Sequence, residues 1–106
     1  MSLSIALPNG FTNVTTAGTA VPLLALTDLN QRVKGAATLL LTARQNKSTA
    51  NTGDVYVGSR AAQSQVLAPG QALAIEILAG EELTLADIFL DAANNGDGVS
   101  YLIKRS

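Results

Sequence analysis

The sequence contains no cysteine, no histidine and no tryptophan, and each absence excludes a class of chemistry. Without cysteine the chain has no disulfide, no zinc–thiolate site and no thiol nucleophile. Without histidine it lacks the commonest general base and the commonest metal-binding side chain. Most familiar hydrolase and metalloenzyme sites are therefore excluded. We expect a protein that is not an enzyme and that has no catalytic residues, no metal site and no cofactor.

Charged side chains are also scarce. They make up 14% of the 106 residues, against about a quarter of an average globular chain. The net charge of −1 gives no overall basic field, so no direct contact with nucleic acid or with a membrane surface is expected. Low charge combined with 47% hydrophobic residues predicts that other subunits cover part of the surface. We expect a closed homo-oligomer, with a trimer favoured.

Long hydrophobic runs are absent as well. The longest, Ala36–Ala43, holds about eight residues, whereas a membrane-spanning helix needs about 20. The first residues, Met1–Pro8, lack the basic start of a signal peptide. Nothing that anchors or exports the chain is therefore expected.

What the sequence does contain is a regular supply of turn residues. Clusters of Asn, Gly and Pro recur along the chain, and the segments between them are short. This spacing is typical of an antiparallel all-β sandwich or barrel. We predict one β-sandwich domain, jelly-roll-like, at residues 12–106, with at most one or two short helical turns. An N-terminal arm is expected at residues 1–11, because chain ends are ordered only when they are tied down.

Individual strands are marked by β-formers and by alternation of apolar residues. Asp54–Gly58 is the clearest strand, and Ala72–Leu78 alternates well, with residues 73, 75 and 77 on one face. Ile88–Asp91 and Val99–Lys104 are predicted to pair as a terminal hairpin across the Asn- and Gly-rich residues 94–98.

Three further segments are harder to assign. Val33–Arg44 is predicted as one long strand, buried on both faces near Leu39–Leu41, because Gly35 and its threonines weaken a helix. Thr15–Leu24 is predicted as an early strand, with Pro22 at an edge or a bend. Glu81–Asp87 could hold one helical turn or a short extra strand.

One acidic segment invites a metal-binding interpretation. Asp91–Gly98 resembles part of a calcium loop, which needs oxygen ligands at fixed positions. Counting from Asp91, the third and twelfth positions are Ala93 and Leu102, which cannot serve. A hairpin loop explains the segment better. Paired carboxylates elsewhere could do glycosidase chemistry, but a chain with only four aromatic residues is poorly suited to line a sugar-binding cleft.

Charge is distributed unevenly along the chain, with a basic middle and an acidic later third. These residues could simply be solvated strand faces. Alternatively, the basic patch of one copy could meet the acidic patch of the next in a head-to-tail contact. The candidate protein–protein interface consists of Arg32, Lys34, Arg44, Lys47, Arg60, Glu76, Glu81, Glu82, Asp87 and Asp91.

Six segments follow one another in an informative order. They are Thr15–Leu23, Val33–Leu39, Asn51–Gly58, Val66–Leu73, Leu85–Ala93 and Asn95–Leu102. Together they resemble a family of small virion structural proteins of tailed bacteriophages and prophages. That family shares an Asn-Thr-Gly-x-Val/Ile-Tyr-Val-Gly strand, a Leu-x-Pro-Gly turn and a closing Gly-Val-Ser-Tyr strand. The resemblance covers roughly residues 12–104, and Phe89 stands where the family often has Tyr.

The resemblance implies a β-sandwich subunit of the virion, made in the bacterial host cytoplasm. The leading hypothesis is a capsid decoration (cement) protein that stabilises the head by symmetric contacts with itself and with the phage major capsid protein. A neck, tail or fibre-base subunit of the same fold is the first alternative. A carbohydrate-binding or adhesin module and a small β-sandwich enzyme are alternatives from other classes.

Overall fold

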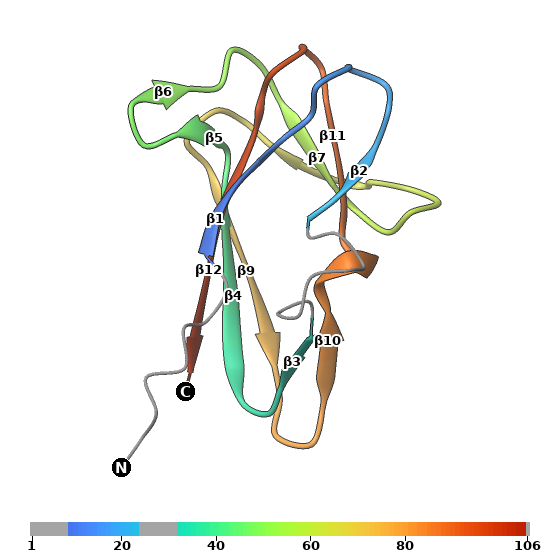
Figure 1. The fold of residues 1–106 in the computed structure, drawn as a ribbon, viewed down its shortest axis with the longest axis vertical. Helices are drawn as coiled ribbons and strands as arrows, with labels where there is room; N and C mark the ends of the chain where they lie inside the picture. Colours follow the sequence, from blue (N-terminus) through green and yellow to red (C-terminus); the bar gives the residue numbers. More distant parts are fainter. Residues whose placement is uncertain (1–8, 24–31, 106) are drawn as a thin grey trace.

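The computed structural model describes residues 9–23 and 32–105, whose strands form two main antiparallel sheets (Figure 1). The first sheet has the order β1 (Asn9–Asn13), β12 (Gly98–Arg105), β4 (Ala37–Thr42) and β9 (Ala72–Ile77). The second sheet has the order β2 (Val21–Pro22), β11 (Phe89–Ala92), β7 (Val55–Gly58) and β8 (Gln65–Leu67).

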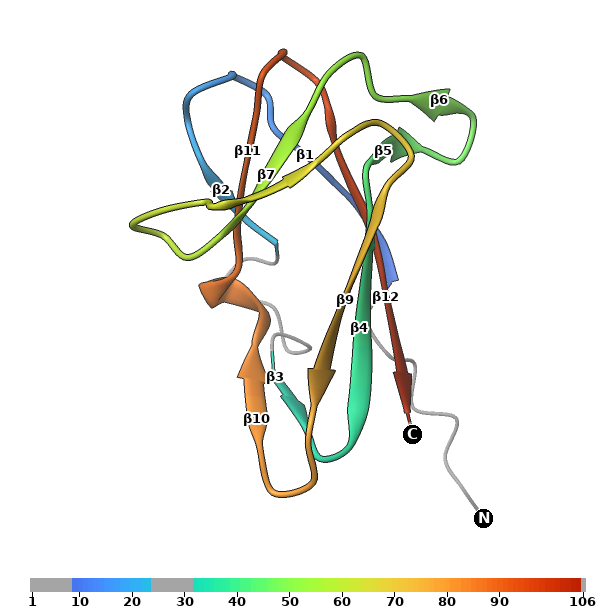
Figure 2. The same ribbon diagram turned by 180° about the vertical axis from the view of Figure 1, so that it is seen from behind.

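Two short ladders and one helical turn complete the described structure. The ladders are β3 (Arg32–Lys34) with β10 (Glu82–Thr84), and β5 (Arg44–Asn46) with β6 (Thr49–Ala50). A 3₁₀ turn, η1 (Leu85–Asp87), follows β10 directly. In Figure 2 the β3–β10 ladder continues the layer of the second sheet beside the lower half of the first. The predicted all-β sandwich with at most short helical turns is confirmed for the described residues.

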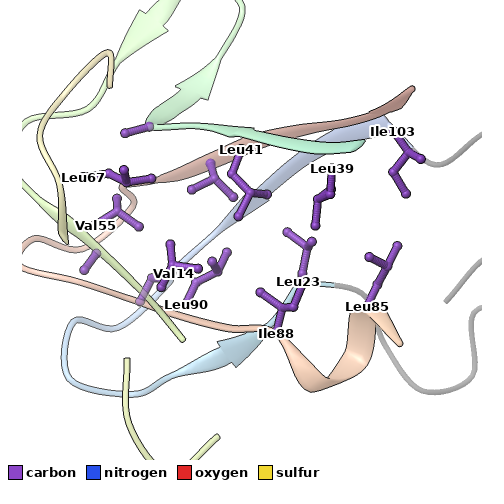
Figure 3. Close-up of a cluster of buried hydrophobic side chains, with 14 of the residues drawn as sticks. Val14, Leu23, Leu39, Leu41, Val55, Leu67, Leu85, Ile88, Leu90 and Ile103 are labelled. Atoms are coloured by element: carbon purple, nitrogen blue, oxygen red, sulfur yellow. The ribbon is translucent and has the colours of Figure 1, made fainter. Parts of the chain in front are cut away.

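The core lies between the layers and follows from strand alternation. Along β4 the residues are buried and half-buried in turn, and Leu39 and Leu41 are fully buried on the inner face. Figure 3 shows Leu39 and Ile103 of the first sheet pointing toward Leu23 and Leu85 on the opposite side. Apolar burial of this kind contributes roughly 25 cal/mol for each Å² removed from water, so the packing of the two layers is the main stabilising contact.

The predicted single strand at Val33–Arg44 is wrong in extent. Gly35 adopts a positive φ of 80°, a conformation that costs glycine little, and the chain turns there between β3 and β4. The first half, β3, pairs with β10, whereas the second half, β4, pairs with β12 and β9. Burial on both faces is also wrong, because Leu40 is only half-buried on the face of β4 that points away from the core.

The predicted terminal hairpin is also wrong. β11 pairs with β2 and β7 in the second sheet, whereas β12 pairs with β1 and β4 in the first. The segment between β11 and β12 therefore crosses from one layer to the other. Hydrogen bonds to the N-terminal part explain the crossing, because Val14 N–H donates to the Asp97 carbonyl at 2.8 Å and Gly96 N–H donates to the Val14 carbonyl at 2.8 Å.

The N-terminal predictions have mixed outcomes. Residues 15–20 form bends and a turn closed by a Thr19 N–H to Thr16 carbonyl hydrogen bond of 3.0 Å, so the early strand shrinks to β2. Pro22 does lie on an edge strand, as predicted. The boundary set at residue 11 falls inside β1, and residues 1–8 of the expected arm lie outside the described residues.

Candidate functional site

The predicted interface residues are spread over both layers of the fold. β3 contains Arg32 and Lys34, the β5–β6 hairpin contains Arg44 and Lys47, and the loop after β7 contains Arg60. The acidic residues lie in β9, the β9–β10 turn, β10, η1 and β11. In the β3–β10 ladder, Lys34 and Glu82 are register partners, so the basic and acidic segments are interleaved there rather than separate.

Three of these charged side chains form hydrogen bonds with the backbone of this chain: those of Arg44 and Glu81 are local, whereas Asp91 also reaches Gly18, 73 positions away. The Arg44 guanidinium donates to the carbonyls of Asn46 and Lys47, at 3.3 and 2.9 Å, and so ties together the tip of its hairpin. The Asp91 carboxylate accepts hydrogen bonds from two backbone N–H groups, at 2.7 and 2.9 Å. Glu81 accepts one from Leu78 N–H at 3.0 Å and closes a turn. A structural role accounts for these contacts.

Arg60 and Asp87, by contrast, come together from segments 27 positions apart and line one surface pocket of about 440 Å³. The pocket lies between β2, the loop after β7, η1 and β11. It is lined by Pro22, Ser59, Arg60, Ala61, Ala86, Asp87 and Phe89. Both Arg60 and Asp87 are exposed, and the Arg60 guanidinium lies over the Phe89 ring, 6.0 Å from its centroid.

The loop that carries Arg60 owes its position to a glycine. A Cβ on Gly58 would lie 2.3 Å from the Ala62 carbonyl oxygen and 2.7 Å from the Gln63 Cα, so a larger residue would displace the loop from β7. Ser59 N–H donates to the Ala62 carbonyl at 2.9 Å, and the Gln63 amide donates to the Ser59 carbonyl at 2.7 Å. These contacts fold the loop back and place Arg60 beside β11.

Gly58→Ala is therefore expected to move the loop and remove Arg60 from the Phe89 ring. Overpacking of this kind typically costs about 1–3 kcal/mol. In NMR spectra, the ring-current shift of the Arg60 side-chain protons should disappear. The control is Gly18→Ala, at a turn with φ of 89° where an added Cβ meets nothing within 4 Å, which should leave that shift unchanged. An unchanged shift in Gly58→Ala would contradict this account of the loop.

The pocket offers a partner two kinds of contact. Pro22 and Ala61 provide apolar surface. The exposed contact between the Arg60 guanidinium and the Phe89 ring lies within the chain, where it contributes about 0.5–1 kcal/mol and helps to hold the guanidinium in place. Arg60 and Asp87 provide one charge of each sign. The Ser59 hydroxyl already interacts with the backbone of Ala62 at 3.3 Å. This arrangement suits recognition of an apolar side chain flanked by charge rather than nucleophilic chemistry.

Sequence reasoning missed the most extensively hydrogen-bonded side chain of the described structure, Asp97. Its carboxylate is fully buried and accepts from Gln45 Nε2 at 2.9 Å, from Thr52 N–H at 2.9 Å and from Gly53 N–H at 2.8 Å. The Thr52 hydroxyl donates to it as well, at 3.0 Å. Burial raises the pKa of Asp97, but the hydrogen bonds from Thr52, Gln45 and Gly53 outweigh burial and hold this pKa below its ordinary value.

A second buried side chain, Asn51, extends this Asp97 cluster. Its amide donates to the Gly98 carbonyl at 2.8 Å, and its carbonyl oxygen accepts from Gly98 N–H at 3.1 Å. The cluster thus joins two of the segments on which the family resemblance rests, residues 51–53 and 97–98. The available signal was the recurrence of Asn or Asp beside Gly in both segments, whose spatial contact the sequence could not reveal.

The geometry of Asp97 bears on the calcium interpretation of its loop. Both carboxylate oxygens face N–H and O–H donors, an environment that suits an anion and disfavours a cation. In the part of the chain that the structure describes, no group of three or more acidic side chains is placed to hold a metal ion. The role of Asp97 is to fasten the connection between the layers.

Comparison with protein-family models, with curated proteins and with solved structures finds no match for this chain. Over residues 9–23 and 32–105, the structure contains no helix of the length and apolarity needed to cross a membrane.

Proposed function

We propose that this chain is a non-enzymatic structural subunit of a tailed-phage particle, a capsid decoration protein that stabilises the head by repeated protein–protein contacts. Its partners are further copies of itself, with a ring of three favoured, and the major capsid protein. The observation that carries the proposal is the surface pocket at Arg60, Asp87 and Phe89, which presents apolar and charged groups to a partner. The assignment of this subunit to a phage particle rests on the sequence resemblance to virion structural proteins.

The contacts made by such a subunit divide into two kinds. Exposed ion pairs at Arg60 and Asp87 are each worth only about 0–1 kcal/mol, so they set orientation and association rate more than affinity. Apolar surface supplies the larger share of the binding free energy. Many weak contacts repeated by symmetry then stabilise a shell.

Purified particles from the phage or prophage that encodes this chain provide the direct test. Quantitative mass spectrometry should find the chain at a copy number comparable to that of the major capsid protein. A few copies per particle would instead support the neck, tail or fibre-base alternative, in which the same surfaces bind other subunits. Absence of the chain from the particles would contradict the proposal.

Arg60→Glu is expected to weaken attachment of the purified protein to particles that lack it, by about tenfold or more. The substitution reverses the charge over Phe89 and places two acidic groups, at positions 60 and 87, in one pocket. The loss should be larger at low salt, where the Debye length is long. The control is Lys47→Glu, an exposed residue on the β5–β6 hairpin with the same change in net charge. Equal losses in both variants would show that net charge, not the pocket, drives attachment.

A carbohydrate-binding or adhesin module is the second candidate, and one observation favours it. Tyr56 and Phe89 both lie on the outer face of the second sheet, because Tyr56 pairs with Asp91 and Phe89 pairs with Gly58. Both rings are half-buried, and aromatic rings that are partly exposed on a sheet face can stack on sugars. Binding to immobilised glycans that disappears in Phe89→Ala, combined with absence from particles, would favour this function.

A further inference from the structure

The outer face of the first sheet, which points away from the core, carries side chains in three rows set by strand register. The first row holds Phe11, Ser100, Thr42 and Ala72, in the order β1, β12, β4 and β9. The second holds Leu102, Leu40 and Ala74. The third holds Lys104, Thr38 and Glu76. Strand β4 runs through the middle of all three rows.

The first two rows of this outer face are mostly apolar, with five apolar side chains among seven. Phe11 and Leu102 are each 43% exposed, Leu40 is half-buried, and Ala72 and Ala74 are exposed. A sheet face that only meets solvent normally carries polar side chains at these alternate positions. Exposed apolar side chains that form a contiguous patch mark interaction surfaces.

We propose that this face binds the same face of a second copy of this chain, about a two-fold axis parallel to β4. Such an axis keeps each row at its own level and exchanges the two sides of the sheet, so β12 of one copy lies over β9 of the other. Leu102 then faces Ala74 of the second copy, and Leu40 faces Leu40. In the third row, Lys104 faces Glu76 of the second copy.

The choice of a second copy rests on self-complementarity. In a two-fold contact, every residue must suit the residue that the axis brings opposite it, and every non-axial pair occurs twice. Here a large side chain meets a small one where Leu102 faces Ala74, and a cation meets an anion where Lys104 faces Glu76. Sheets that pack face to face need this interdigitation at a separation of about 10 Å.

The size of the face sets the expected strength. The three strands that overlap about this axis are β12, β4 and β9, and Phe11 of β1 lies outside the overlap. With strands about 4.8 Å apart and rows about 7 Å apart, three strands and three rows cover on the order of 300 Å² in each copy. A standard protein interface buries about 800 Å² per partner. The contact is therefore a weak dimer. It does not use the pocket, so it stands independently of the proposed function.

Sedimentation equilibrium of the full chain, from about 1 to 500 μM at low salt, tests the contact. The parent should show a dimer component that grows with concentration. Lys104→Glu and Glu76→Lys should each raise the dissociation constant by about tenfold or more, because each places like charges together at two symmetric positions. The double variant restores both pairs, and its dissociation constant should return to within about threefold of the parent.

Two further variants complete the experiment. Leu40→Glu places two acidic groups at the axis and should abolish the dimer, with circular dichroism used to check that the domain folds. Lys47→Glu lies outside the face and should leave dimerisation unchanged. The proposal is overturned if the chain stays monomeric throughout, or if any oligomer it forms is indifferent to the Lys104 and Glu76 variants or is not restored by the double exchange.

Discussion

Asp97→Ala is expected to lower the free energy of unfolding by about 3 kcal/mol or more. The substitution leaves the N–H groups of Thr52 and Gly53 and the Gln45 amide without their acceptor. A buried donor left unsatisfied costs about 1–3 kcal/mol, and these three donors are part-buried, so about 1 kcal/mol for each is expected. The total is a large fraction of the roughly 5–15 kcal/mol that stabilises a typical domain. Urea denaturation should show the midpoint falling by about 1 M or more, given a slope of about 1–3 kcal/mol/M.

Acid is expected to weaken the same cluster, and Asp97→Asn tests this. Because the folded-state pKa of Asp97 lies below the value of about 3.9 in an unfolded chain, the ionised carboxylate stabilises the fold fully above that value. This contribution is lost as the pH falls below about 4 through the folded-state pKa. The stability difference between the parent and Asp97→Asn should therefore shrink from pH 5 toward pH 2.

A matched control is available for the cluster. Asp54→Asn alters a half-exposed carboxylate next to Gly53 in the sequence and should change stability by less than about 0.5 kcal/mol. A constant difference between the parent and Asp97→Asn at every pH would show that Asp97 is not the titrating group. A small loss in Asp97→Ala would contradict the structural role assigned to the carboxylate.

Leu39→Ala is the second substitution with a large expected effect, a loss of about 2–5 kcal/mol. Leu39 is fully buried between the layers, and Figure 3 shows Leu23 pointing toward it from the opposite side. Truncation removes apolar contact and leaves a cavity. Leu40→Ala, one residue along on the outer face, removes the same atoms from a half-buried site and should cost only about 1 kcal/mol.

Thermal unfolding, at a protein concentration well below the dissociation constant of the proposed dimer, compares the two leucine variants. A 1 kcal/mol change shifts the melting temperature by roughly 4–8 °C for a domain of this size. Equal losses in both variants would mean that β4 is buried on both faces, as the sequence had suggested, and would contradict the open outer face.

Local patterns predicted much of the fold. The alternation in β9 and the β-formers of β7 identified real strands, because side chains on one face of a strand must meet the core together. The main error concerned which strands pair with each other, rather than where the strands lie in the sequence. Nothing local in β11 and β12 reveals that each pairs with strands far away in the sequence, and the intervening Asn- and Gly-rich segment is typical of a hairpin.

The candidate site was less accessible from the sequence. The uneven distribution of charge along the sequence drew attention to Arg60 and Asp87, but it could not show that they line the same pocket. That pocket depends on the close packing of the loop after β7 against Gly58. The same distribution included Arg44 and Asp91, whose side chains form hydrogen bonds with the backbone of this chain, at Lys47 and at Gly18. It gave Asp97 no separate role, because a carboxylate inside a folded protein is recognisable only from the donors that surround it.

The central place of β12 in the first sheet has a consequence for synthesis on the ribosome. β12 separates β4 from β1, yet roughly 55 residues are made between the end of β4 and its arrival. At about 5–20 residues per second, this interval lasts several seconds. Throughout it, β1 has no partner and one edge of β4 is open to pairing with other nascent chains. Slower synthesis of the last strand is therefore expected to lengthen the time for which these strand edges stay exposed.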